Sequence, residues 1–209
     1  MIEEFVNKLN YRIQQGLPGI SAQQKMAPAI REIKPYEENE YPDAKKASVL
    51  ILFYPHADDI YTVLMKRPDY DGVHSGQVSF PGGKVETTDK DPAYTALRET
   101  EEEVGIKMDA IQLMGKLSNI YIPPSNFFVF PYLGYLNYRP QFIPDKNEVA
   151  AIVETPIKII LDDSIKGMQE IIREDIKFNA PYYLIQNQKV WGATAIIMSE
   201  LEILLKDVF

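Results

Sequence analysis

The chain has no cysteine among its 209 residues. This absence excludes disulfide bonds, thiolate nucleophiles and metal sites built from cysteine. It also fits the reducing cytoplasm, because disulfides form and persist in oxidising compartments. We therefore expect a cytoplasmic protein whose chemistry does not use a thiol.

Signals for membranes and nucleic acid are also missing. The first five residues, Met1 to Phe5, contain neither a basic stretch nor an apolar run of the kind that starts a secretory signal. No apolar run approaches the ~20 residues that cross a bilayer. The formal net charge is −8, which repels nucleic acid. We expect partners of neither kind.

The length and the hydrophobic content of 45% are sufficient for a core without cross-links. We expect one domain over 1–209, in which 1–46 form an N-terminal helix and an irregular arm and 47–209 form the core. Helical spacing of apolar residues predicts the first helix over 2–15, and four prolines make 17–46 irregular. This arm is compatible with a homodimer interface, although no residue in it requires one.

The rest of the chain alternates between strand patterns and helical patterns. A hairpin is predicted from strands over 47–54 and 60–66. The further predictions are strands near 112–120, 127–137, 148–154, 169–178 and 181–186, a short helix over 156–162, and a C-terminal helix from about 195. This order is compatible with a mixed sheet between helices, although the pattern alone leaves the topology open.

One helix carries an unusual number of acids. Asp91 is a suitable N-cap, Pro92 suits the first helical position and Gly105 suits a left-handed C-cap, so the helix is predicted over 92–104. At about 100° per residue, its glutamates at 99, 102 and 103 share one arc. The core face is expected to contain Ala93, Tyr94, Leu97 and Val104.

Glu99, Glu102 and Glu103 repel one another on a bare helix, so they need a functional reason or free access to water. Oxygen-only ligands suit Mg²⁺ or Mn²⁺ rather than zinc. The alternative is a solvated acidic face. The preceding Gly82-Gly83 turn and the neighbouring Arg98 favour the metal site.

These residues resemble the Nudix box, in which Gly, five residues, Glu and seven residues precede Arg-Glu-apolar-x-Glu-Glu-x-Gly-apolar. Residues 98–106 match the second half, with Thr100 in an apolar position. In the first half, counting back from Arg98 reaches lysines, whereas counting forward from Gly83 reaches Asp89. One extra loop residue reconciles the counts. Asp89 and Glu86 are both candidates for the ion pair with Arg98.

Further stretches resemble the coenzyme A pyrophosphatase branch of that family. They are Leu64 to Arg67, His74 to Gly83, Leu17 to Gly19 with Ala22-Gln23, Pro124 to Phe127 with Pro131 to Gly134, and Trp191 to Ala195. The branch commonly has a basic residue shortly before its His-x-Gly, and Asp71-Gly72-Val73 contains none.

The resemblance implies an α+β fold, an α/β/α sandwich with a mixed sheet between helices. It implies Mg²⁺ or Mn²⁺ held by Glu99, Glu102, Glu103 and the Gly83 carbonyl, with Glu99 as ligand or base. Glu148 is our candidate for a further catalytic acid, and its alternative is an ordinary polar residue at the start of a strand.

The expected substrate-binding residues are Lys66, Arg67, His74, Gly82 and Gly83. Lys66 and Arg67 are equally explained as surface charges at a strand end, and His74 as a residue that orders its loop. Aromatic residues between Tyr121 and Tyr132 are candidates for stacking on adenine or for the core.

The expected function is hydrolysis of the diphosphate bond of coenzyme A or acyl-coenzyme A, which gives 3′,5′-ADP and a 4′-phosphopantetheine fragment. A second possibility is another nucleoside diphosphate derivative, such as ADP-ribose, NADH or a dinucleoside polyphosphate. A third is a binding module that recognises a nucleotide without turnover, although such modules commonly lose the carboxylates that this helix keeps.

Overall fold

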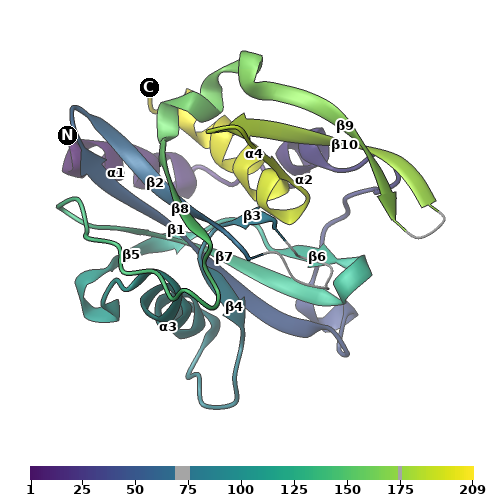
Figure 1. Cartoon of the computed structure of the whole chain (residues 1–209), viewed down its shortest axis with the longest axis horizontal. Helices are drawn as coiled ribbons and strands as arrows, with labels where there is room; N and C mark the ends of the chain where they lie inside the picture. The colour runs from purple at the N-terminus through teal and green to yellow at the C-terminus, as the bar shows by residue number, and fades with distance from the viewer. Residues whose placement is uncertain (69–75, 174–175) are drawn as a thin grey trace.

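The chain folds around a mixed sheet of eight strands, and a smaller antiparallel sheet of three strands lies beside it (Figure 1). The computed structural model describes residues 1–68, 76–173 and 176–209. Its helices are α1 (Ile2–Gln14), α2 (Ile20–Gln23), α3 (Pro92–Val104) and α4 (Ala193–Lys206). Its strands are β1 (Lys45–His56), β2 (Asp59–Lys66), β3 (Val78–Ser79), β4 (Gly82–Lys84), β5 (Gln112–Lys116), β6 (Ile120–Ile122), β7 (Phe127–Tyr135), β8 (Ala151–Pro156), β9 (Lys166–Arg173), β10 (Ile176–Ile185) and β11 (Gln188–Trp191).

Strand β1 lies at the centre of the large sheet. It pairs with β2 and β4 in the antiparallel sense and with β7 in the parallel sense, so the sheet is mixed. Residues Leu50 to Tyr54 of β1 are all inaccessible to solvent, as expected for a strand covered on both faces. The predicted hairpin of β1 and β2 is confirmed.

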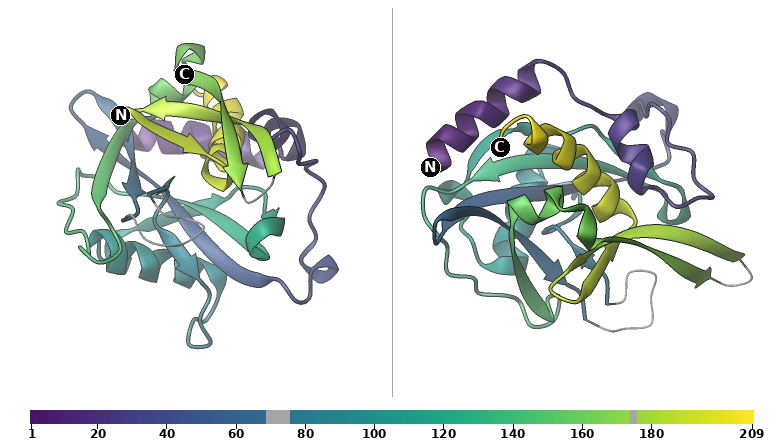
Figure 2. Two further views of the ribbon diagram at one scale, coloured as in Figure 1. Left: turned by 45° about the vertical axis from the view of Figure 1, so that its right-hand side comes forward. Right: turned by 90° about the horizontal axis from the view of Figure 1, so that it is seen from above.

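Helices cover the two faces of this sheet (Figure 2). Leu50, Leu52 and Tyr54 share one core cluster with residues of α3. Ile51 and Phe53, which point the other way, share the second cluster with residues of α1 and α4. The predicted arrangement of a mixed sheet between helices is therefore confirmed.

Helix α3 has the predicted bounds and caps. The Asp91 side chain accepts a hydrogen bond of 2.7 Å from the Tyr94 N–H, and Gly105 is left-handed with φ of 77°. The predicted core face was right only in part, because Val104 is buried and Leu97 packs against the core cluster. Ala93, Tyr94 and Leu97 are only half-buried, whereas Thr95, Ala96, Thr100, Glu103 and Val104 are buried. Thr100 fits its apolar position because its hydroxyl donates to the Ala96 carbonyl at 2.7 Å.

The arm that follows α1 is tied to the C-terminal helix. The buried carboxylate of Glu200 on α4 accepts hydrogen bonds from the Gly19 N–H, the Gln23 amide and the Ser118 hydroxyl, at 3.1, 3.0 and 2.7 Å. The arm also contains the short helix α2, which the proline count did not predict. Between Gly19 and Gln23 the arm therefore packs against its own chain.

Several strand boundaries differ from the prediction. The strand predicted over 112–120 is two strands, because the Ser118 backbone turns its N–H toward Glu200 instead of continuing the ladder. The strand predicted from 148 begins at Ala151, and the short helix near 156 is a 3₁₀-helix over Ile157–Leu161. The strand break predicted near 179–180 was wrong, and β11 was missed. The turn before β11 is at Gln186 and Asn187, which both have positive φ.

Among the helices that the model describes, none is long and apolar enough to cross a bilayer.

Candidate active site

Arg98, in the middle of α3, is the centre of an ion-pair network. Its guanidinium contacts both carboxylate oxygens of Asp89, at 2.9 and 3.0 Å. The Asp89 side chain is fully buried and also accepts hydrogen bonds from the Thr95 hydroxyl and the Glu86 N–H. Chiefly because of the bond to Arg98, the pKa of Asp89 lies well below its usual range. Of the two candidates, Asp89 is the partner of Arg98, and Glu86 is exposed.

The same guanidinium reaches two of the box glutamates. Its Nη1 lies 2.9 Å from Glu99 and 2.7 Å from Glu102. Its Nη2 also donates to the Lys84 carbonyl at 3.3 Å, which ties the helix to the end of β4. Arg98 therefore fixes the positions of two predicted ligands relative to the glycine turn.

Glu103 lies inside the protein, with a side chain only 1% exposed. It accepts a hydrogen bond of 2.7 Å from the Gly82 N–H, and the Arg67 guanidinium lies 3.5 Å away. Its pKa is raised to about 8, chiefly by burial and in smaller part by the charges of Glu99 and Glu148, whereas Gly82 and Arg67 oppose the shift. Few hydrogen-bond donors contact this carboxylate, although it is deeply buried.

The glycine turn is shaped by close contacts on both sides. A Cβ on Gly82 would lie 2.2 Å from the Ser48 carbonyl oxygen, and one on Gly83 would lie 2.4 Å from the Glu99 carboxylate. Any side chain at 82 would strike the backbone of β1, whereas one at 83 would displace Glu99. The Gly83 backbone and the Glu99 carboxylate can therefore present their oxygens to one ligand.

Glu102 and Glu148 are more exposed than the other two acids. The Glu102 side chain is 56% exposed, and Glu148 is exposed in the turn before β8. That turn is anchored to α3, because the Asp145 N–H donates to the Glu103 carbonyl at 3.0 Å and the Glu148 N–H donates to the Asp145 carbonyl. The Glu148 charge raises the pKa of Glu99 and of Glu103, so the fold brings Glu148 near them.

The carboxylates of these acids do not surround one common point. In residues 1–68, 76–173 and 176–209, no three acidic or histidine side chains form a ready cation site. Glu99 and Glu102 are instead held by Arg98, and Glu103 is held by the Gly82 N–H and Arg67.

The donor set nevertheless fits a hard divalent cation. Its atoms are carboxylate and carbonyl oxygens, and Glu99 lies where a Cβ of Gly83 would be. Burial, together with the other acids, raises the pKa of Glu99 as it does that of Glu103. A positive charge among these oxygens would offset both effects.

The predicted substrate-binding residues are distributed around this cluster. Arg67 contacts Glu103 and lies 3.4 Å from the Gly82 carbonyl, so it belongs to the site. Lys66 ends β2, where its carbonyl accepts from the Ala150 N–H at 2.8 Å. His74 lies outside the described residues. Of the aromatic candidates, Phe128 and Phe130 are core residues, whereas Tyr121 stacks on Tyr41 at 4.1 Å.

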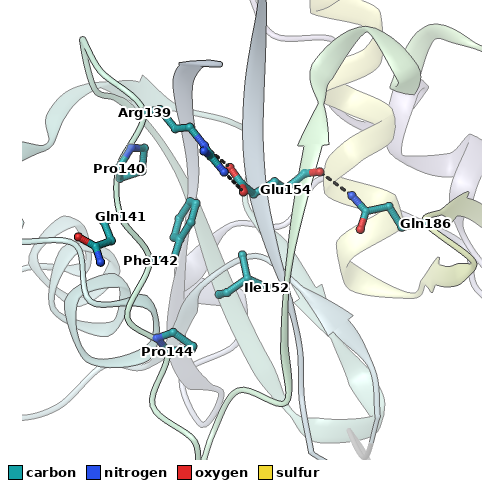
Figure 3. Close-up of a pocket in the computed structure, with 8 residues that line it drawn as sticks. All are labelled: Arg139, Pro140, Gln141, Phe142, Pro144, Ile152, Glu154 and Gln186. Carbon is teal, nitrogen blue, oxygen red and sulfur yellow. Dashed lines mark hydrogen bonds and ion pairs between the residues drawn. The ribbon is translucent and has the colours of Figure 1, made fainter. Parts of the chain in front are cut away.

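A cleft of about 680 Å³ that the sequence did not predict lies between the 139–144 loop and β8 (Figure 3). Arg139 and Glu154 form a bidentate ion pair across it, at 2.7 and 3.2 Å, and the Tyr54 hydroxyl donates to Glu154. Its lining residues come from segments as distant as 139 and 186, so no local pattern could reveal it. Because its charges neutralise each other, it lacks the excess of carboxylates found beside Gly83.

Comparison with known proteins identifies the family and the fold. Residues 44–174 match the family model described as the NUDIX domain. The chain is 36% identical, over 66% of its length and 69% of the relative, to "Uncharacterized Nudix hydrolase NudL" of Yersinia pestis (strain Pestoides F), and equally to the NudL protein of Yersinia pseudotuberculosis serotype O:1b. A MutT/nudix family protein from Enterococcus faecalis superposes with a TM-score of 0.51 at 16% identity, over 96% of this chain and 74% of that one.

Proposed function

The chain belongs to the NUDIX domain family and is a pyrophosphohydrolase, and we propose that it hydrolyses the diphosphate bond of coenzyme A or acyl-coenzyme A. The products are 3′,5′-ADP and a 4′-phosphopantetheine fragment. The observation that carries the reaction is the placement of Glu99 and Glu103 against the Gly82-Gly83 turn.

The proposed cofactor is Mg²⁺ or Mn²⁺, and the residues that would hold it are Glu99, Glu102, Glu103 and the Gly83 carbonyl. When bound, such an ion neutralises phosphate oxygens and acidifies a coordinated water. The chain itself supplies the positioning. Arg98 holds Glu99 and Glu102, and the Gly82 N–H holds Glu103.

Arg67 and Lys66 are proposed to bind a substrate phosphate. The Arg67 guanidinium is 30% exposed, and its contacts to Glu103 and Gly82 are long, at 3.5 and 3.4 Å. It therefore keeps N–H donors for a planar, bidentate contact with phosphate oxygens. Such a contact would also hold the diphosphate against the acids of α3.

Glu148 and Glu99 are the two proposed candidates for the general base. Glu148 is exposed on a turn anchored to α3, so it can reach a water beside the substrate. Glu99 already pairs with Arg98 at 2.9 Å, and this contact opposes the rise of its pKa, which favours a ligand role.

The choice of coenzyme A is supported by the stretches that resemble the coenzyme A pyrophosphatase branch, spread over 17–195. Because Asp71-Gly72-Val73 contains no basic residue, we retain a second substrate class as the alternative. That class contains other nucleoside diphosphate derivatives, such as ADP-ribose, NADH or a dinucleoside polyphosphate.

The test is to incubate the purified protein with Mg²⁺ or Mn²⁺ and a panel of these compounds, and to identify the products. We expect coenzyme A to be cleaved fastest and to release 3′,5′-ADP. Faster cleavage of ADP-ribose would contradict the proposed substrate but not the proposed type of reaction. No cleavage of any diphosphate with either metal would overturn the reaction for this site.

A further inference from the structure

Strand β9 is the one long strand edge, among the residues that the model describes, that nothing protects. The free edge of β6 is covered by the Arg31 side chain, which donates to the Tyr121 carbonyl. The edge of β8 is capped by Gln186, whose amide donates to the Glu154 carbonyl at 2.7 Å. The edge strand β5 has a register shift between Leu113 and Gly115.

β9 has none of these features. Its eight residues pair with β10 in unbroken register from Lys166 to Arg173, and it contains no proline. The ribbon of β9 and β10 projects beyond the main sheet (Figure 2), with β9 on its outer side (Figure 1). Native proteins blunt such edges with charge, proline or bulges, because an open edge pairs with another strand.

The side chains on the outward face of β9 are apolar where water would favour polar ones. Met168 is 62% exposed and Ile172 is 69% exposed. Glu170 lies between them on the same face, and its carboxylate is 2.7 Å from Lys177 of β10. The charge on this face is therefore neutralised within the chain, and two large apolar groups flank it.

This pattern is symmetric about Glu170, and on that basis we propose that β9 is the interface of a homodimer. The occupant is β9 of a second copy, antiparallel, with a two-fold axis at Glu170. Each Met168 then lies opposite the partner's Ile172 on the same face, and the two small sheets become one continuous sheet. Such a self-complementary patch is what a two-fold interface requires.

The charges are compatible with this register. The two Glu170 side chains meet at the axis, and each already has its own Lys177. Lys177 is paired with Ile172 and therefore lies diagonal to Glu170, so the four charged side chains around the axis are two lysines and two glutamates with no net charge. A two-fold axis at Gln169 or at Ile171 would not place Met168 opposite the partner's Ile172.

The first test is sedimentation of the full chain over a dilution series. We expect a mass of twice the 23.9 kDa chain at high concentration. The double variant Met168→Lys, Ile172→Lys should sediment at half that mass. The matched control is Ile176→Lys, because Ile176 is 57% exposed in the same hairpin but lies on β10. It should stay dimeric, and circular dichroism should show all variants folded.

The second test uses the absence of cysteine from the chain. Opposite residues of paired strands have Cα atoms about 4.5–5.5 Å apart, within the range that a disulfide spans. Glu170→Cys should therefore form a dimer-linking disulfide on mild oxidation. Asn179→Cys, one strand further from the axis, should form little.

A wild-type chain that stays monomeric throughout the dilution series would overturn the proposal. So would a dimer that survives both lysine substitutions, since it would use another surface. Equal cross-linking of the two cysteine variants would overturn the register and the two-fold axis.

Discussion

Glu103 and Glu200 are both glutamates buried on helices, but they lie on opposite faces of the main sheet and have opposite surroundings. Glu103 on α3 has one backbone N–H at 2.7 Å and one distant guanidinium, and it lies beside other acids. Glu200 on α4 is surrounded by neutral donors from Gly19, Gln23 and Ser118.

The difference shows how a buried carboxylate that can bind a ligand is distinguished from one that only stabilises the fold. Burial alone does not separate the two carboxylates, since their exposures are 1% and 0%. The number of donors does, because a saturated carboxylate stabilises the elements that surround it, whereas an under-coordinated one favours a cation.

The largest expected effect is on catalysis at Glu103. Glu103→Gln keeps the volume and the bond from Gly82 but removes a proposed ligand charge. We expect metal-dependent hydrolysis to fall by about 100-fold or more, which is roughly 2.7 kcal/mol in the barrier. The readout is the initial rate with saturating metal. A loss of less than about tenfold would remove Glu103 from the proposed ligands.

The same variant has a predicted effect of opposite sign on stability. The folded-state pKa of Glu103 is raised to about 8, so ionisation costs the native state stability as the pH rises from the unfolded value toward 8. Glutamine does not ionise. The free energy of unfolding of Glu103→Gln at pH 8 should therefore equal or exceed that of the wild type, as measured with urea in the presence of a chelator.

The next largest effect is at Asp89, a buried carboxylate that is fully paired. Asp89→Asn should lower the free energy of unfolding by about 2.5 kcal/mol at pH 7, because charge-assisted bonds to Arg98 are lost. Since the folded-state pKa of Asp89 is lowered, its contribution is present above its unfolded pKa and is lost as the pH falls below it. The difference between variant and wild type should therefore shrink below about pH 4.

The control for that experiment is Glu86→Gln. Glu86 is exposed, and only its backbone contacts Asp89: its N–H donates to the Asp89 carboxylate, and its carbonyl accepts from the Asp89 N–H. Its substitution should leave the urea midpoint unchanged. Equal losses for the two variants would contradict the assignment of Asp89 as the main partner of Arg98.

Glu200→Gln tests the other side of the contrast. The amide would turn a donor toward groups that are themselves donors, so we expect a loss of about 2 kcal/mol in the free energy of unfolding. The hydrolysis rate per folded molecule should be unchanged, since Glu200 is on the face opposite α3. A large loss of hydrolysis rate without a loss of stability would contradict the structural role of Glu200.

The smallest effect is expected at the glycine turn. In Gly83→Ala the new Cβ displaces the flexible end of Glu99, so activity should fall about tenfold, or roughly 1.4 kcal/mol, while thermal unfolding changes little. Gly82→Ala is the contrast, because its Cβ meets the Ser48 backbone, which cannot move away. That variant should lower the midpoint of thermal unfolding; equal midpoints for the two would contradict this account of the turn.

Much of the fold could be predicted because its signals are local. The bounds of α3 followed from Asp91, Pro92 and Gly105, which act within one helical turn of the end that they cap. The hairpin of β1 and β2 followed from alternation and turn residues. The mixed sheet followed from the order of elements together with the resemblance to the Nudix box.

Predictions failed where distant contacts decide. Helical spacing put Ala93 and Tyr94 in the core, but the sheet and the glycine turn bury the neighbouring face that includes Glu103. The strand over 112–120 is divided because Glu200, more than eighty residues away, binds Ser118. No pattern within a few residues contains such information.

The sequence by itself determined which residues are available: three acids on one capped helix, a paired-glycine turn and an arginine between them. Only the tertiary structure decided that Asp89 rather than Glu86 holds Arg98, that Glu103 is the buried acid, and that Glu148 lies near it. The physical reason is that capping and periodicity act over a few residues of chain. Burial, ion pairing and the resulting pKa shifts depend on groups that only folding brings together.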